Sequence, residues 1–142
     1  MKAHETLLAP RIDKLLGIGV YATETSGIGG VIRASVDDFV VEEVLVDGSK
    51  AEIEKAAESR VLRASHSKQR FLLCVLVKRN WDMFIAIKNI AKQLGISQKQ
   101  ISIAGIKDAK AITAQHITIE HASMEDIAKV NVKDLEIRAV GY

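Results

Sequence analysis

The 142-residue sequence has one cysteine, one proline and few aromatic side chains, which make up 4% of the chain. A single cysteine excludes a disulfide within the chain, and therefore a small fold held together by disulfides. With so few aromatic residues, the core must be filled mainly by Val, Ile, Leu and Ala. Charge of one sign is also lacking: the formal net charge is only +2, whereas a typical nucleic-acid-binding domain has a strong basic excess.

Long hydrophobic runs are missing too. The longest apolar run, residues 71–77, is far shorter than the roughly 20 residues that span a bilayer. The N-terminal stretch MKAHETLLAPRID lacks the apolar core of a secretion signal. Cys74 lies inside the apolar run, where aliphatic neighbours offer nothing to stabilise a thiolate, so we expect it to be a buried packing residue. These features are typical of a cytoplasmic globular protein of one domain, without a membrane partner.

Hydrophobic periodicity and turn residues predict an α+β fold, with a mixed, largely antiparallel sheet and helices packed on it. Strands are expected at residues 31–35, 36–49, 70–79, 101–106, 112–120 and 134–142. Helices are expected at residues 49–66, 81–94 and 123–130. Because stretch 49–66 is rich in Ala, Glu, Lys and Arg, we interpret it as a helical insertion within the single domain.

Helix 81–94 is expected to pack on the sheet through one apolar side. Phe84, Ile87, Ala91 and Leu94 recur at helical spacing along that side. Gly95 follows directly, and glycine commonly ends a helix because it adopts the left-handed conformation without strain.

The most unusual stretch is ISIAGIKDAKAITAQHITIE, residues 101–120. In it, two runs rich in β-branched residues flank a short charged segment, Lys107-Asp108-Ala109-Lys110. Spacing alone favours a surface turn, because aspartate accepts hydrogen bonds from nearby backbone N–H groups. The alternative is a site in which an ionised Asp108 acts as a nucleophile or a base, while the lysines contact phosphates. Gly105 has no side chain and would permit close approach of a ligand.

Two motifs in the chain resemble one known family. AGIKDAKAITAQ resembles the Ala-Gly-x-Lys-Asp-x-x-Ala-x-Thr-x-Gln signature of TruD-type tRNA pseudouridine synthases. GIGGVIRASVDDFVVEEV resembles the Gly-x-Ile-Lys/Arg-x-x-x-x-Asp-Phe-x-Val-x-Glu segment of the same family. The order and separation of the two motifs also agree, and the resemblance covers roughly residues 17–115. The chain, residues 1–142, is therefore identified as the N-terminal portion of a pseudouridine synthase catalytic domain.

The resemblance implies an enzyme that isomerises a specific uridine, at position 13 in the D-arm of tRNA, to pseudouridine. The bond between uracil N1 and ribose C1′ breaks, and the base rejoins the sugar through C5, so the reaction implies neither a metal nor a redox cofactor. The family's essential carboxylate corresponds to Asp108. Whether Asp108 acts first as a nucleophile or as a base stays open. The target uridine must leave its stack, as enzymes that act on a base require.

The resemblance also assigns further site residues. Arg33 matches a basic residue near the catalytic carboxylate and is expected to pair with Asp108; the alternative is a strand-edge arginine in solvent. Phe39 is expected to line the pocket, or else to pack in the core, and Glu42 to brace the site through hydrogen bonds. The remaining matched residues are expected to permit close approach, hold the loop or contact the RNA backbone: Gly105, Lys107, Thr113 and Gln115.

Two parts of the family pattern have no counterpart here, a Gly-Asn-x-Phe segment that contributes an aromatic side chain to the pocket and a large inserted domain. We therefore expect the chain alone to be inactive. The chain would also present an unfinished sheet edge, and unpaired edges favour self-association.

Two other kinds of site were considered. SGIGGVIRA has the Gly-x-x-Gly spacing of the loop with which K-homology RNA-binding modules clamp a nucleic-acid backbone, but that loop should join two helices. Such a module would lose RNA affinity on Gly29→Asp and tolerate Asp108→Asn. The enzyme would instead lose catalytic activity on Asp108→Asn and tolerate Gly29→Asp. Metal binding by His116, Glu120 and His121 is not expected, because strand alternation places the two histidines on opposite faces.

Overall fold

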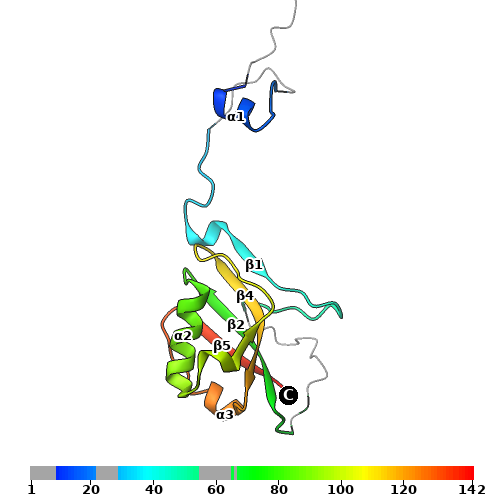
Figure 1. Ribbon diagram of the computed structural model, residues 1–142, viewed down its shortest axis with the longest axis vertical. Coiled ribbons are helices and arrows are strands. Elements are labelled where there is room, and N and C mark those ends of the chain that lie inside the picture. The colour runs from blue at the N-terminus through cyan, green and yellow to red at the C-terminus, as the bar shows by residue number, and fades with distance from the viewer. Residues whose placement is uncertain (1–8, 22–28, 55–64, 66) are drawn as a thin grey trace, which may run out of the picture. The chain divides into compact units, whose positions relative to one another are not determined.

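The computed structural model describes residues 9–21, 29–54, 65 and 67–142. The chain divides into two units, Met1–Val31 and Ile32–Tyr142. In the first unit, the short helix α1 (Arg11–Leu15) buries none of its own residues. The second unit contains the sheet and every other described helix (Figure 1). None of the described helices is long and apolar enough to cross a membrane.

The second unit is built on a five-stranded sheet. Its strands are β1 (Val40–Glu42), β2 (Phe71–Arg79), β3 (Ile101–Ile103), β4 (Ile112–Glu120) and β5 (Leu135–Gly141). They follow the order β1-β4-β2-β5, and β3 also pairs with β4. The pairing of β1 with β4 is parallel and the other pairings are antiparallel. The predicted α+β class with a mixed, largely antiparallel sheet is confirmed.

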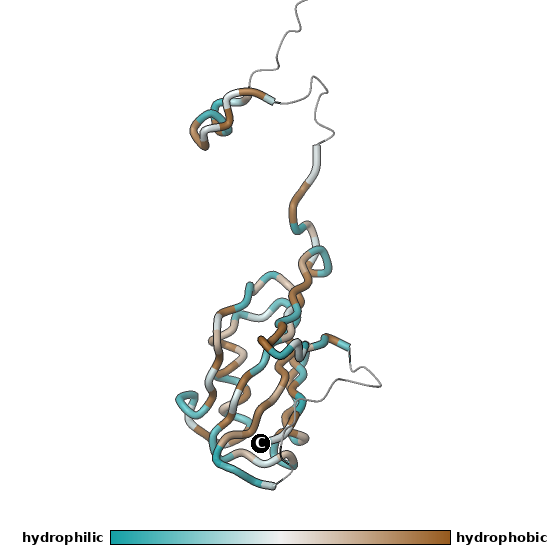
Figure 2. Tube along the Cα trace, turned by 90° about the vertical axis from the view of Figure 1, so that its right-hand side faces the viewer, coloured by the Kyte–Doolittle hydropathy of each residue, from teal (hydrophilic) through white to brown (hydrophobic). Residues whose placement is uncertain are grey.

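Two helices, α2 (Met83–Leu94) and α3 (Met124–Ile127), lie against one face of the sheet (Figure 1). Leu72, Cys74 and Leu76 alternate along β2 toward this face, and they pack in one core with Ile90 of α2. In Figure 2 the strands carry much of the brown of apolar residues, and the turns are mainly teal. Burial raises the pKa of the Cys74 thiol to about 12, so Cys74 is the packing residue that the sequence predicts.

The opposite face of the sheet carries a smaller core. Val75 and Val77 of β2 lie there with Ala114 of β4, and Ala51 is buried against them. Ile53 packs on the same cluster. The segment after β1 therefore covers part of the face that the helices leave open.

Several predicted elements are present in the structure. Strands 70–79 and 134–142 correspond to β2 and β5, and helix 81–94 corresponds to α2. Gly95 ends α2 with a left-handed φ of 67°. A capping box between Ser97 and Gln100 opens the 3₁₀ turn η2 (Gln98–Gln100).

One residue of the predicted helix side was wrong. Phe84 is 60% exposed, whereas Met83 and Ile90 are almost fully buried. The apolar stripe of α2 begins at Met83 and continues through Ile87 and Ile90, which are three or four residues apart. Phe84 falls outside that stripe.

The predicted strand 31–35 was also wrong. Arg33 has a left-handed φ of 56°, which no strand allows. Ser35 and Asp38 then form a capping box around the 3₁₀ turn η1 (Val36–Asp38). The predicted strand 36–49 is reduced to β1 and an isolated bridge between Val44 and Lys50.

The expected helical insertion at 49–66 lies largely outside the described residues. Residues 49–54 and 65, which the structure does describe, contain no helix. The reason is visible at the start of the segment, because Ala51 N donates to the carbonyl oxygen of Glu43 at 2.8 Å and Ile53 N donates to the carboxylate of Glu42 at 2.8 Å. These bonds tie Ala51 and Ile53 to Glu43 and Glu42 at the end of β1.

Candidate active site

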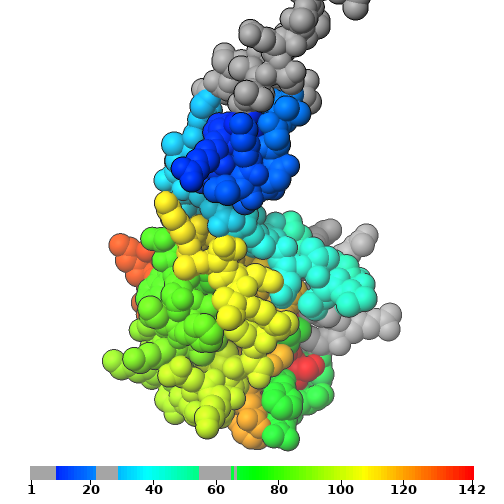
Figure 3. Space-filling model, turned by 45° about the horizontal axis from the view of Figure 1, so that its top comes forward, coloured from blue at the N-terminus to red at the C-terminus, as the bar shows by residue number. Residues whose placement is uncertain are grey.

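Three strand ends meet at one end of the sheet. In the register of the sheet, Ile112 at the start of β4 pairs with Val40 of β1 on one side and Arg79 of β2 on the other. The irregular loop 104–111 enters β4 at this point and carries Asp108. Figure 3 shows this loop (yellow) beside the segment that leads into β1 (cyan) on the same surface.

Asp108 pairs with an arginine that is far away in the sequence. Arg33 Nη1 lies 3.1 Å from Asp108 Oδ1, and the two side chains are 40% and 49% exposed. This is the partner expected from the resemblance. Exposed ion pairs contribute only about 0.2–1 kcal/mol to stability, so the main effect of this contact is to orient the carboxylate.

Phe39 supports the same arginine. The guanidinium carbon of Arg33 lies 3.6 Å from the centroid of the Phe39 ring, a cation–π contact. The backbone of Phe39 is fixed as well, because its carbonyl oxygen accepts a hydrogen bond from Ile112 N at 3.0 Å. Phe39 is half-buried, so it is neither a plain core residue nor a freely exposed pocket wall.

A buried lysine, which the sequence reasoning missed, contacts Asp108 from the other side. Lys78 is 1% exposed, and its Nζ donates a hydrogen bond to the backbone carbonyl oxygen of Asp108. Burial lowers the pKa of Lys78, and the charges of Asp108 and Asp82 oppose that shift. Strand alternation was the available signal, because it puts Lys78 on the same face as Leu76.

Lys107 is held by the protein itself. Its Nζ lies 3.2 Å from Glu43 Oε1, and Glu43 Oε2 accepts a hydrogen bond from His116 N at 2.7 Å and lies 3.1 Å from His116 Nδ1. Burial by itself would raise the pKa of Glu43, but the hydrogen bonds from His116 and Lys107 outweigh it and leave that pKa lowered. Of the two roles expected for Lys107, the geometry favours holding the loop. The sequence reasoning did not identify Glu43.

Gln115 and Thr113 lie inside the protein. Gln115 is 1% exposed, and its Nε2 donates to the carbonyl oxygen of Gly105 at 3.1 Å. Thr113 is fully buried. Within the described part of the chain, Thr113 Oγ1 and Gln115 Oε1 have no hydrogen-bond partner. Both side chains therefore lie beneath the loop rather than on a surface that RNA could reach.

Gly105 faces open space. A Cβ built there would meet no atom of the protein within 4 Å. Packing inside the chain therefore gives no reason for a glycine at this position.

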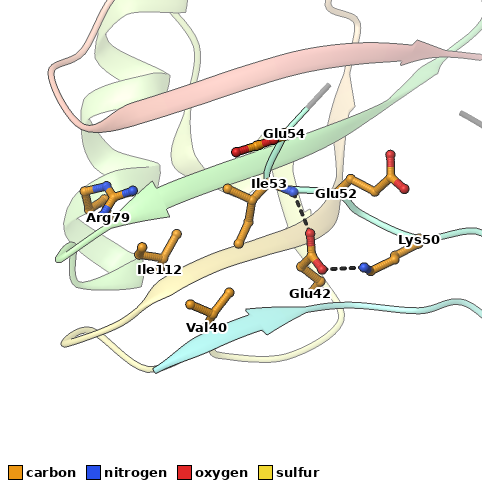
Figure 4. A pocket seen from close by; sticks show the side chains of 8 residues that line it. All are labelled: Val40, Glu42, Lys50, Glu52, Ile53, Glu54, Arg79 and Ile112. Atoms are coloured by element: carbon orange, nitrogen blue, oxygen red, sulfur yellow. Dashed lines mark hydrogen bonds and ion pairs between the residues drawn. The ribbon is translucent and has the colours of Figure 1, made fainter. Parts of the chain in front are cut away.

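Glu42 holds the segment that follows β1, at the same end of the sheet. Its carboxylate accepts a hydrogen bond from Ile53 N at 2.8 Å and pairs with Lys50 (Figure 4). The hydrogen bond from Lys50, and then that from Ile53, lowers the pKa of Glu42. These contacts run to the segment after β1 and not to the Asp108 loop.

A groove of about 520 Å³ lies beside Glu42. It is lined by Val40, Glu42, Lys50, Glu52, Ile53, Glu54, Arg79 and Ile112 (Figure 4). Acidic side chains outnumber basic ones in this lining, and Arg79 is paired with Asp37 at 2.5 Å. RNA phosphates bind to basic side chains that are not already paired with carboxylates, so this groove is a poor RNA site. The group formed by Asp108, Arg33, Phe39 and Lys78 is the better candidate.

The rival kinds of site find little support in the described residues. No group of three or more His, Cys, Asp or Glu side chains in the described ranges could hold a metal ion. The Gly-x-x-Gly loop lies partly outside these ranges, and residues 29–35 on its C-terminal side contain no helix.

Comparison with known proteins agrees with the two motifs. The profile of the family described as "tRNA pseudouridine synthase D (TruD)" matches residues 15–142. Two similar curated proteins carry the name "Probable tRNA pseudouridine synthase D". The one from Methanosarcina barkeri is 36% identical over 93% of this chain and 26% of its own length. The one from Pyrobaculum aerophilum is 42% identical over 80% of this chain and 26% of its own length.

A solved structure matches as well. The crystal structure named for tRNA pseudouridine synthase D (TruD) from Methanosarcina mazei superposes with a TM-score of 0.71 and 32% identity. It covers 95% of this chain and 27% of the other. The chain thus spans about a quarter of the length of the relatives that it matches.

Proposed function

We propose that this chain, which belongs to the tRNA pseudouridine synthase D (TruD) family, carries the catalytic carboxylate of an enzyme that isomerises a uridine in tRNA to pseudouridine. The observation that carries the proposal is the pairing of Asp108 with Arg33, whose nitrogen lies 3.1 Å from a carboxylate oxygen. Such a pair keeps a carboxylate oriented toward an incoming sugar or base.

The chemistry requires one carboxylate and no added atoms. Arg33 bonds Oδ1 of Asp108, so we assign Oδ2 to the substrate. Either Oδ2 bonds C1′ of the ribose as N1 leaves and is itself displaced when C5 joins C1′, or Oδ2 accepts a proton from the ribose and later returns it, so the carboxylate is regenerated in both routes. The N1–C1′ bond breaks, the uracil turns, C5 joins C1′, and the proton on C5 leaves for solvent while N1 gains one. Bond making and bond breaking balance, which makes the reaction an isomerisation.

The substrate in this proposal is tRNA, and the target is the uridine at position 13 of the D-arm. Gly105, three residues before Asp108, faces open space, which would let a flipped nucleotide come close to the backbone. Phe39 contributes by holding Arg33 in place. Glu42 contributes by holding the segment that follows β1. The reaction would take place in the cytoplasm, where the tRNA is.

The described cluster is only part of a cleft. Since the aligned part of this chain covers only 26% of the length of each of these relatives, we propose that the isolated chain is inactive and that further residues complete the pocket. The outer strands of the main sheet path are β1 and β5. In isolation their edges would favour self-association.

The test is product analysis on unmodified tRNA. The complete protein that carries this sequence is expected to convert one D-arm uridine to pseudouridine, detected by nuclease digestion and mass spectrometry of the fragments. The 142-residue chain is expected to bind tRNA weakly and convert none. Failure of the complete protein to form pseudouridine in any tRNA would refute the proposed function.

A further inference from the structure

Lys78 is the largest of the fully buried side chains in the described part of the structure. It lies near the end of β2, opposite Thr113 of β4 in the register of the sheet. Charged side chains are almost never fully buried unless they are paired. The hydrogen bond of this ammonium goes to a main-chain oxygen, the carbonyl of Asp108.

We propose that Lys78 is a positioning residue of the active site, whose buried ammonium fixes the backbone of Asp108 while Arg33 fixes its carboxylate. This inference rests on the proposed catalytic role of Asp108. It assigns Lys78 no contact with RNA, because a side chain that is 1% exposed cannot reach a substrate outside the protein.

The Asp108 loop needs such an anchor because it has no regular secondary structure of its own. Other contacts hold its flanks: Gln115 bonds Gly105, Lys107 pairs with Glu43, and Asn80 N donates to Ala111 O at 3.0 Å. The Lys78 contact is made to Asp108 itself. A hydrogen bond from an ammonium is about twice as strong as one between neutral groups, and an error of about 1 Å in a reacting group can reduce the rate about 100-fold.

A purely structural role explains Lys78 poorly. Taking an ammonium out of water is unfavourable, and burial correspondingly lowers the pKa of Lys78. A methionine of similar length would fill the same space without that penalty, and apolar replacements of buried ions are often neutral or stabilising. A buried lysine beneath the loop is therefore better explained by the positioning of Asp108 than by a contribution to the free energy of folding.

The experiment is Lys78→Met in the complete protein, assayed by tritium release from tRNA labelled at uracil C5. We expect kcat to fall by about 100-fold and KM for tRNA to stay within about twofold, since the interaction lost does not involve the bound RNA. The melting temperature is expected to stay unchanged or to rise. Lys88→Met, which removes an exposed lysine of α2, is the matched control and should change neither kcat nor melting temperature.

Two results would overturn the inference: a kcat for Lys78→Met within about threefold of wild type, or a loss of activity that only follows a loss of folded protein. A rise in KM at constant kcat would make Lys78 a binding residue and refute it as well. Failure of the proposed function is distinguishable, because the unmutated protein would then release no tritium, or Asp108→Asn would retain activity, whatever Lys78→Met does.

A second measurement needs no variant. In the unmutated 142-residue chain, NMR should detect one lysine ammonium whose protons exchange slowly with water, with a scalar coupling across the hydrogen bond to the Asp108 carbonyl carbon. A set of lysine ammonium signals that all exchange as fast as free lysine would contradict the proposal.

Discussion

Asp108 is an exposed residue that is held at two of its atoms. Arg33 contacts a carboxylate oxygen at 3.1 Å, and Lys78 contacts the main-chain oxygen from the buried side. Neither contact is large in stability terms, since the first is exposed to solvent and the second requires burial of a charge. Their combined effect is orientation, which a carboxylate needs to act on a nucleotide that is brought in from outside.

Arg33 and Phe39 should act as one unit. Arg33→Lys keeps the positive charge but loses the flat guanidinium that lies on the Phe39 ring. We expect Arg33→Lys and Phe39→Leu each to lower kcat by about tenfold in the complete protein, as removal of an orienting contact would.

A double-mutant cycle checks this coupling. The double variant should lose little more than either single variant, because both changes disturb the same contact. Melting temperatures should shift little for Arg33→Lys, since the ion pair is exposed. Losses that multiply in the double variant would show that the two side chains act independently.

Residues in linear motifs were predictable, and residues that act through the fold were not. Asp108 and Arg33 stand in stretches that resemble a family signature, so their pairing across 75 positions could be expected. Lys78 is followed by Arg79, the last residue of β2, and two adjacent basic side chains at the end of a strand are usually exposed to solvent. Only the alternation of β2, together with knowledge of which face the helices cover, shows that its ammonium points inward.

At the scale of elements, strand and helix periodicity identified β2, α2 and β5, whose buried faces dominate their sequences. The stretch 31–38 failed because its β-branched residues favour a strand, while Arg33 adopts a positive φ and Ser35 caps a turn. Local hydrogen bonds and tertiary contacts determine the conformation of this stretch, despite the β propensity of its residues. That irregular course is what brings Arg33 to the loop.

Glu43 should make the Asp108 end of the fold sensitive to acid. The pKa values of Glu42 and Glu43 are lowered from a usual value of 4.5. Since the folded state binds these protons less tightly than the unfolded state does, the stability gained is fully present above about pH 4.5 and is lost as the pH falls through the lowered values. Melting temperature measured across this window should therefore fall with pH.

Glu43→Gln separates this effect from general acid unfolding. The variant should be less stable than wild type near pH 7, and the difference should shrink below pH 4. Glu125→Gln changes an exposed glutamate on α3 and serves as the control, with a profile like that of wild type. A Glu43→Gln profile that stays parallel to wild type at every pH would contradict the assignment.

The start of α2 depends on Asp82. Its carboxylate accepts hydrogen bonds from Phe84 N at 2.9 Å and Ile85 N at 3.1 Å. Asp82→Ala should reduce the free energy of unfolding by about 1 kcal/mol, measured by urea denaturation. Asp82→Asn, which can still accept these bonds, should lose less; equal losses in both variants would assign the effect to charge alone.

At the scale of the whole molecule, the chain provides one end of a sheet and not a closed pocket. The helix-covered face holds the larger core, and the opposite face carries an acidic groove that is unsuited to phosphate. The chain spans about a quarter of the length of its relatives, so under the proposed function most of the tRNA-binding surface would come from residues outside it. Sequence motifs indicated Asp108 as the candidate catalytic residue, whereas the remaining walls of the proposed pocket could not be derived from this chain.

The outer strands lead to a prediction about assembly. The 142-residue chain should associate with itself at concentrations above the micromolar range because its sheet edges are unpaired. Sedimentation velocity over a concentration series would detect this. The complete protein should remain a single species over the same series, and a chain that stays monomeric at the highest concentration would contradict the expectation.

The central claim, that Asp108 is the catalytic carboxylate, is tested most directly by single-turnover tritium release with the complete protein. Asp108→Asn replaces the carboxylate with an amide of the same shape, and we expect its rate to fall at least about 1000-fold while tRNA binding persists. Asp47→Asn, a change in an exposed turn, should leave the rate unaltered. An Asp108→Asn protein that releases tritium as fast as the Asp47→Asn protein would contradict the account.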